Sequence, residues 1–143
     1  MKELLTTIDI QAPPEKIWDI LTDFDKYPEW NPFIISIRGD LTLNSRLKVY
    51  IKPKDSKGMN INPKVVTYTK NKRFSWVGNL AIPGLFEGHH IFEIEPKNEH
   101  ESKLIHREEF RGLLLPLLWK KLDTQTRAGF EDMNRAIKIK AEQ

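Results

Sequence analysis

The 143-residue sequence contains no cysteine. Disulfide bonds, thiolate metal ligands and a cysteine nucleophile are therefore excluded. A reducing compartment is consistent with this absence, and we expect a cytoplasmic protein. Hydrophobic residues make up 39% and charged residues 30% of the chain, which is the balance of a folded domain rather than of a disordered segment. At this length we expect a single domain spanning residues 1–143.

Long apolar runs and basic blocks are also missing. The longest apolar run, residues 113–119, is far shorter than the roughly 20 residues that a membrane-spanning helix requires, so we expect no stable membrane insertion. The first residues lack the sustained apolar core of a secretory signal. Net charge is +3, and lysines and arginines are interspersed with acidic residues. We therefore expect no nucleic-acid partner.

The common catalytic signatures are absent as well. The sequence holds no GxSxG elbow, no phosphate-binding loop, no HExxH zinc motif and no dinucleotide fingerprint. We therefore expect no cofactor and no bound metal. Ser75 and Ser102 have no obvious base partner in the sequence, and His100 lies in a charged turn where we expect it to be solvated.

What the sequence does contain is a clear periodicity that changes along the chain. Residues 4–10 alternate as a strand, prolines 13 and 14 precede a helix at 15–21, and a second short helix ends at Pro28 or Pro32. Six further strands follow, separated by turn-like residues: 33–38, 46–52, 60–69, 74–80, 86–95 and 103–111. Because no crossover helix is available between them, these strands should form an antiparallel meander.

The chain closes with one long amphipathic helix, predicted over residues 115–141. Its apolar stripe steps by three or four residues and comprises Leu115, Leu118, Leu122, Thr126, Phe130, Met133 and Ile137. A sheet with one apolar face must cover that face, and this stripe is the only long cover that the sequence offers. The expected fold class is therefore α+β, with seven curved antiparallel strands gripping the C-terminal helix and two short helices between strands 1 and 2.

Four stretches carry a resemblance to a known family: APPEKIWDILTDFDKYPEWNPFI at 12–34, FSWVGNLAIPGLFEGHHIFEIEP at 74–96, LIHREEFRGLLLPLL at 104–118 and GFEDMNRAIK at 129–138. Together with the order of elements, they resemble the START-like or helix-grip superfamily, in particular its bacterial polyketide cyclase/dehydrase-like group, which shares the pollen-allergen fold. The resemblance covers essentially the whole chain. It implies a hydrophobic cavity between sheet and helix, with Trp30 and Phe33 wedged beneath the terminal helix near the cavity floor.

Three ionisable residues are predicted to reach this interior. Alternation in the last strand places His106 and Glu108 on the same face as Leu104 and Phe110, and His90 shares a face with apolar neighbours in the preceding strand. If the two strands are adjacent, these three side chains converge near Trp76. They could act as a general acid/base pair, as metal ligands, or simply as partners that satisfy each other and orient a ligand.

The leading hypothesis is a binding protein for a small apolar molecule: a lipid, an isoprenoid, a fatty-acyl or an aromatic, polyketide-like compound. A binding cavity of this kind should exceed roughly 300 Å³. The residues expected to contact the ligand are Trp30, Trp76, His90, Phe92, His106, Glu108, Phe110, Phe130 and Met133.

Two alternatives remain open from the sequence. One is a cyclase/dehydratase-like enzyme that uses His106 and Glu108 as an acid/base pair, and the other is a protein-interaction module without a ligand. The hairpin from Asn79 to Glu87, bracketed by glycines and a proline, could be a lid over the cavity or a plain turn. Neither the ligand nor the choice between monomer and homodimer can be predicted.

Overall fold

The structure is a computed structural model of the chain and describes residues 1–79 and 83–143. The elements in chain order are β1 (Lys2–Ile10), α1 (Pro14–Thr22), η1 (Phe24–Lys26), α2 (Tyr27–Trp30), β2 (Ile34–Arg38), β3 (Lys48–Ile51), β4 (Met59–Ile61), β5 (Lys64–Thr69), β6 (Arg73–Asn79), β7 (Glu87–Asn98), β8 (Glu101–Arg111), α3 (Leu115–Lys121), η2 (Leu122–Thr126) and α4 (Arg127–Ala141). The predicted α+β order, with short helices after the first strand and one long terminal helix, is confirmed.

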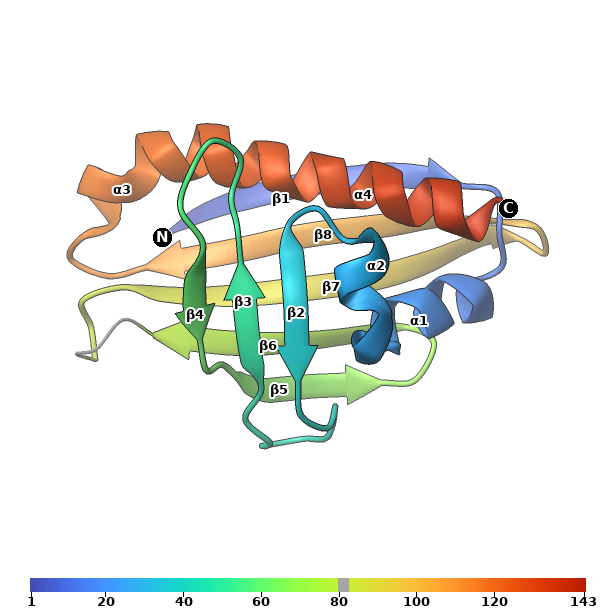
Figure 1. Cartoon of the computed structure of the whole chain (residues 1–143), viewed down its shortest axis with the longest axis horizontal. Coiled ribbons are helices and arrows are strands. Elements are labelled where there is room, and N and C mark those ends of the chain that lie inside the picture. The colour runs from blue at the N-terminus through green and yellow to red at the C-terminus, as the bar shows by residue number, and fades with distance from the viewer. Residues whose placement is uncertain (80–82) are drawn as a thin grey trace.

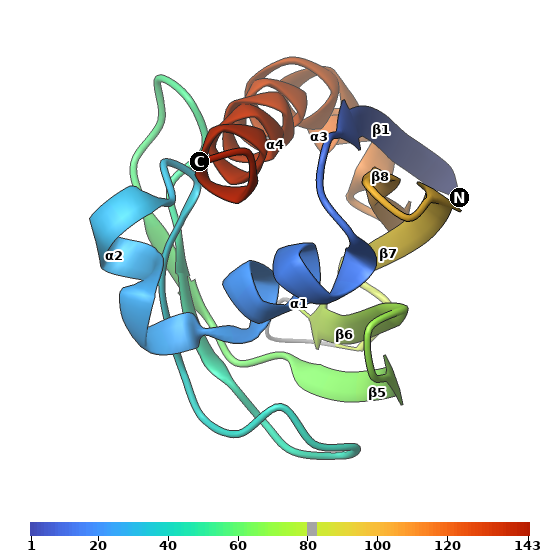
Figure 2. The same ribbon diagram turned by 90° about the vertical axis from the view of Figure 1, so that its right-hand side faces the viewer.

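The strands form two antiparallel sheets that curve around the terminal helix (Figures 1 and 2). One sheet has the order β1-β8-β7-β6-β5 and the other the order β2-β3-β4. They are joined at a corner, where Leu47 N–H donates to Pro63 O at 2.9 Å and the backbones of Arg46 and Lys64 form an isolated antiparallel β-bridge. In the view of Figure 2, α1 lies across one end of the roll. The result is the helix-grip architecture expected from the sequence.

One predicted strand is divided in two, which makes eight strands among the described residues. The sequence predicted a single strand over 60–69, but β4 ends at Ile61 and β5 begins at Lys64. Pro63 lies at the break, and proline has no N–H to offer a sheet ladder. Because of this break β4 pairs with β3 while β5 pairs with β6, so the chain passes from one sheet to the other here.

The terminal helix runs from Leu115 to Ala141 as predicted, with one irregular turn. Residues Leu122–Thr126 adopt a π-helical turn between α3 and α4. In α4 the predicted stripe faces the interior, where Phe130, Met133 and Ile137 are fully buried. Such a single π turn within an α-helix is frequently found beside a functional site.

The aromatic segment at residues 22–34 packs against this helix through Phe33. Phe24 and Tyr27 are buried and pack edge to face, and the Asn31 side chain accepts hydrogen bonds from the N–H groups of Phe33 and Ile34, both at 2.9 Å. The ring of Phe33 lies where a Cβ atom on Gly129 would be, so the glycine allows helix and ring to approach closely. The prediction for Phe33 as a wedge beneath the helix agrees with this contact.

Candidate functional site

A cavity of about 110 Å³ lies inside the roll, near the π turn. It is lined by residues from both sheets and from the helix: Phe33, Ile51, Pro53, Met59, Ile61, Trp76, Gly78, Asn79, Phe86, Gly88, Glu108, Phe110, Leu122 and Thr126. This volume is well below the roughly 300 Å³ expected for a drug-sized ligand. It corresponds more closely to the space that holds a single benzene-sized molecule in an apolar protein interior.

Strand register brings the predicted ionisable residues together beside this cavity. His90 on β7 lies directly opposite Glu108 on β8 and opposite Trp76 on β6. His106 is one inward position further along β8, opposite Phe92. His90 and His106 are 1% and 0% exposed, so both imidazoles belong to the interior as predicted.

The ionisable residues form part of a chain of polar contacts that ends at β1. His90 Nδ1 lies 3.4 Å from Glu108 Oε1, and His90 Nε2 lies 2.7 Å from His106 Nε2. His106 Nδ1 is 2.9 Å from Asn134 Oδ1 on α4. Asn134 Nδ2 donates to Thr6 Oγ1 at 3.0 Å, and Thr6 Oγ1 donates to the carbonyl oxygen of His106 at 2.6 Å.

The donor and acceptor of each hydrogen bond in this row of contacts can be assigned by starting from Thr6. A backbone carbonyl only accepts, so the single hydroxyl proton of Thr6 is used on His106 O, and Thr6 Oγ1 must accept from the Asn134 amide nitrogen. The Asn134 amide oxygen therefore faces His106 Nδ1, which must donate. His106 in its neutral form then accepts at Nε2, and His90 Nε2–H is the donor.

His106 is held in its neutral form by its surroundings. Burial, and then the neighbouring His90, lower the pKa of His106 well below its usual value, while the hydrogen bond with Asn134 opposes this shift in part. The imidazole also stacks on Phe130, with ring centroids 4.0 Å apart and an interplanar angle of 7°. This site offers no solvent to an imidazolium, and it fixes the ring orientation from both sides.

Glu108 is the member of the chain that reaches the cavity. Its side chain is 15% exposed, and it lines the cavity beside Gly88 and Phe110. Glu108 Oε2 lies in the space that a Cβ atom on Gly88 would occupy. Gly88 is therefore the residue that makes room for the carboxyl group at the cavity wall.

The geometry bears on two of the chemical alternatives. The two Nε2 atoms face each other at 2.7 Å and share one proton, so they do not open toward a common metal ion. Within residues 1–79 and 83–143 no group of three His, Asp or Glu residues could hold a metal. His106 does not line the cavity, so an acid/base role there falls to Glu108 with His90 behind it.

The predicted ligand-contacting residues separate into three groups. Trp76, Glu108 and Phe110 line the cavity. A second layer lies behind the wall and is buried without lining it: His90, Phe92, His106, Phe130 and Met133. Trp30 does neither, because it packs on Tyr27 in α2 and borders a surface hollow that includes Lys140 and Gln143.

Several lining residues were not predicted from the sequence. Met59 and Ile61 come from the short strand β4, which the undivided 60–69 prediction did not place at the interior. Leu122 and Thr126 belonged to the predicted apolar stripe, but the π turn on which both lie has no evident sequence signal. Asn134 was missed altogether, although a polar residue between Phe130 and Ile137 on a buried helix face is a readable sign of an internal partner.

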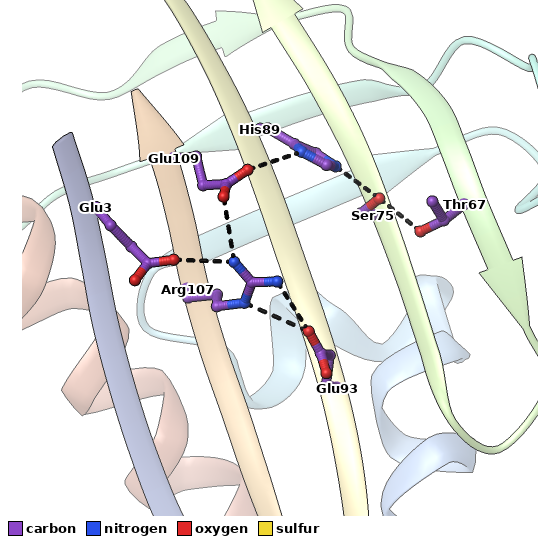
Figure 3. Close-up of polar contacts among 7 residues, drawn as sticks. All are labelled: Glu3, Thr67, Ser75, His89, Glu93, Arg107 and Glu109. Carbon is purple, nitrogen blue, oxygen red and sulfur yellow. Dashed lines mark hydrogen bonds and ion pairs between the residues drawn. The ribbon is translucent and has the colours of Figure 1, made fainter. Parts of the chain in front are cut away.

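A second polar row occupies the opposite, outer face of the same strands (Figure 3). His89 Nε2 lies 2.9 Å from Ser75 Oγ, and His89 Nδ1 lies 3.4 Å from Glu109 Oε1. The sequence showed no obvious base partner for Ser75, and sheet register supplies one from β7. The order Ser-His-Glu matches a catalytic triad, but Ser75 is 1% exposed and its hydroxyl also contacts Thr67 Oγ1 at 2.6 Å. A buried hydroxyl of this kind is not accessible to a substrate.

Arg107 completes the outer row. Its guanidinium contacts Glu3 and Glu93 at 2.9 and 3.0 Å and Glu109 at 3.5 Å, as drawn in Figure 3.

The predicted hairpin from Asn79 to Glu87 lies partly outside the described residues, since 80–82 are not described. Its residues Asn79 and Phe86 line the cavity.

No helix in the described part of the chain is long and apolar enough to cross a membrane.

Solved structures share this fold. A START superfamily protein from Mycobacterium smegmatis superposes with a TM-score of 0.76 at 20% identity, covering 99% of this chain and 97% of that one. A hypothetical protein from Helicobacter pylori gives a TM-score of 0.79 at 13% identity, covering 98% and 88%. The di-domain ARO/CYC protein BexL from the BE-7585A biosynthetic pathway gives 0.74 at 15% identity, covering 96% of this chain and 46% of that one. Identities this low establish the fold alone.

The sequence itself gives the family. A comparison with curated protein sequences finds no match. Residues 1–142 match the family described as polyketide cyclase / dehydrase and lipid transport. The START-like resemblance inferred from the sequence is therefore confirmed, and the chain belongs to the polyketide cyclase/dehydrase and lipid transport family.

Proposed function

We propose that this protein binds a small, mainly apolar molecule, about the size of a single ring, in the cavity between the sheets and the C-terminal helix. The observation that carries this proposal is the composition of the cavity wall. Of the lining residues that the structure describes, nine have apolar side chains, two are glycines, and three are polar, namely Asn79, Glu108 and Thr126. A few polar groups in an apolar wall are typical of a pocket that binds by burial and orients its ligand by polar contacts.

The size of the cavity limits both the ligand and its affinity. A volume near 110 Å³ holds a single ring or a short branched chain, and a longer lipid would need the wall to move. Burial of apolar surface contributes roughly 25 cal/mol per Å², so a ring-sized molecule gains only a few kcal/mol before the cost of association. We therefore expect micromolar to millimolar affinity for a simple hydrocarbon probe.

Titration with toluene tests this proposal directly. The amide signals of Gly78 and Gly88, which both line the cavity, should shift in the NMR spectrum as toluene is added. Thr126→Phe should abolish these shifts, because it fills the cavity from the helix. Thr124→Phe is the matched control, since Thr124 lies on the same π turn but is exposed. Equal shifts in all three proteins, or none in the wild type, would overturn the proposal.

An enzymatic function is the alternative that one observation favours. Glu108 presents a carboxyl group to the cavity with an imidazole 3.4 Å behind it, an arrangement suited to removing a proton next to a carbonyl. The test is deuterium exchange at the central carbon of acetylacetone, a small β-diketone. Acceleration by the wild type that is lost in Glu108→Gln would support catalysis, and equal exchange in the two proteins would exclude this role for Glu108.

A further inference from the structure

Glu108 narrows the class of ligand that this cavity accepts. We infer that the ligand is a neutral molecule carrying a hydroxyl group, an alcohol or a phenol, which donates a hydrogen bond to Glu108 Oε2. The inference rests on the proposed binding function and adds to it the chemistry of the polar contact. It follows from three features: the directions of the buried hydrogen bonds, the position of the free carboxyl oxygen, and the absence of a lining cation.

The buried hydrogen bonds determine which ring atom of His90 faces Glu108. His90 Nε2–H is already used as the donor to His106, so Nδ1 is the ring atom that faces Glu108 Oε1 at 3.4 Å. Without a further proton, the lone pair of Nδ1 would face a carboxylate in a buried site, which is unfavourable. A proton placed between the two groups, on His90 Nδ1 or on Glu108 Oε1, removes this repulsion. In both arrangements the pair has no net charge.

The second carboxyl oxygen is an acceptor in both arrangements. If the proton is on His90, Glu108 is a carboxylate and Oε2 accepts; if it is on Glu108 Oε1, Oε2 is a carbonyl oxygen and still accepts. Oε2 lies above Gly88 at the cavity wall, on a side chain that is 15% exposed. A ligand donor in the cavity can therefore reach this oxygen in place of water.

The rest of the wall disfavours charged ligands. Among the residues that the structure describes, no lysine, arginine or histidine lines the cavity, so a carboxylate ligand would be buried beside Glu108 without a cation. With a proton between His90 and Glu108, an ammonium group would be buried beside a pair that has no net charge, which leaves its desolvation uncompensated. A free fatty acid is thereby disfavoured among the fatty-acyl compounds considered from the sequence, and a neutral hydroxyl compound fits the wall.

Four probe molecules test the inference. Toluene and p-cresol form a matched pair that differs by one hydroxyl group. Benzoate and benzylamine add a negative and a positive charge to a similar ring. Dissociation constants are measured by NMR titration of the whole protein, and the measured quantity is the ratio of the toluene constant to the p-cresol constant. We expect this ratio to fall by about tenfold in Glu108→Leu, because the variant keeps an apolar wall but removes the acceptor.

A second variant moves the acceptor without removing it. In Gly88→Ala the new methyl group would occupy the position of Glu108 Oε2, so the carboxyl group must turn away, and the ratio should again fall severalfold. Gly78→Ala is its matched control, because Gly78 lies opposite Gly88 in the sheet and also lines the cavity, yet its Cβ would be 3.8 Å from the nearest atom, on Pro63. Glu109→Leu is the control for Glu108→Leu on the outer face of the same strand.

The outcomes separate the two proposals. A ratio that falls in Glu108→Leu and Gly88→Ala but not in the controls, with benzoate and benzylamine at least about a hundredfold weaker than p-cresol, is the expected result. If toluene and p-cresol bind but the ratio is the same in all variants, or a charged probe binds as well as p-cresol, the hydroxyl inference is wrong and the binding function stands. If neither toluene nor p-cresol binds, the proposed function fails, and this inference fails with it.

Discussion

Strands β7 and β8 carry two polar rows of similar composition on opposite faces. On the inner face His90 lies opposite Glu108, and on the outer face His89 lies opposite Glu109. Each imidazole is 3.4 Å from its carboxylate. The inner side chains are 1% and 15% exposed, whereas the outer ones are 28% and 26% exposed. The same pair of residue types at the same separation therefore differs mainly in its access to water.

What lies behind each pair decides its chemistry. The inner imidazole is backed by His106 and Asn134, whose hydrogen bonds make His90 Nε2–H the donor to His106. The outer carboxylate is backed by Arg107, a permanent cation that also contacts Glu3 and Glu93. The inner row is thus a chain of buried, directional contacts, and the outer row is a network of charges screened by solvent. Mutation, pH and salt should each affect the two rows differently.

The largest difference is expected from removing the central residue of each row. His106→Ala leaves a cavity against Phe130, and it leaves the buried His90 Nε2 and Asn134 Oδ1 without their hydrogen-bond partner. It should therefore lower the free energy of unfolding by about 3–5 kcal/mol. Arg107→Ala removes partly exposed ion pairs and should cost below about 1 kcal/mol. Urea denaturation of both variants measures the two costs.

The conservative variant His106→Gln serves as the control for lost volume. It keeps a polar side chain of intermediate size and should recover part of the stability lost in His106→Ala. Equal costs for His106→Ala and Arg107→Ala would contradict the description of the inner row as a set of mutually dependent buried contacts.

Much of this arrangement could be predicted because it depends on periodicity along one element. Alternation in β8 placed His106 and Glu108 inside, and the helical stripe placed Phe130 and Met133 against the sheet. Contacts between elements could not be predicted in this way. Asn134 meets His106 only because α4 crosses β8 at one rotation, and Ser75 meets His89 only because of the β6–β7 register. The volume of the cavity likewise depends on how large side chains fill the space between layers, which no single strand pattern contains.

The response to pH is the next largest expected difference. Because burial, and then His90, lower the folded-state pKa of His106 below that of the unfolded chain, the unfolded chain binds a proton that the folded protein does not. Stability from this residue is therefore complete above the unfolded value of about 6.5 and is lost as pH falls below it, by at most about 1.4 kcal/mol per pH unit.

Unfolding free energies at several pH values between about 7 and 5 measure this slope, the range being set by the unfolded histidine pKa. Glutamine at position 106 cannot titrate, so the slope of unfolding free energy against pH should be smaller in His106→Gln, by up to about 1.4 kcal/mol per pH unit. If wild type and His106→Gln show the same slope over this range, the acid sensitivity of the protein arises elsewhere. The folded-state pKa of His106 would then not lie below that of the unfolded chain.

The smallest expected effect concerns salt and the outer row. Glu93→Gln removes one carboxylate from Arg107 and should cost about 0.5 kcal/mol at low ionic strength, a cost that should vanish near about 0.5 M NaCl because exposed ion pairs are screened. The cost of His106→Ala should not change with salt, since its contacts are buried. Denaturation of both variants at the two salt concentrations measures this contrast. A cost for Glu93→Gln that persists at high salt would mean that the outer row is held by directional hydrogen bonds as the inner one is, and that water alone does not separate the two faces.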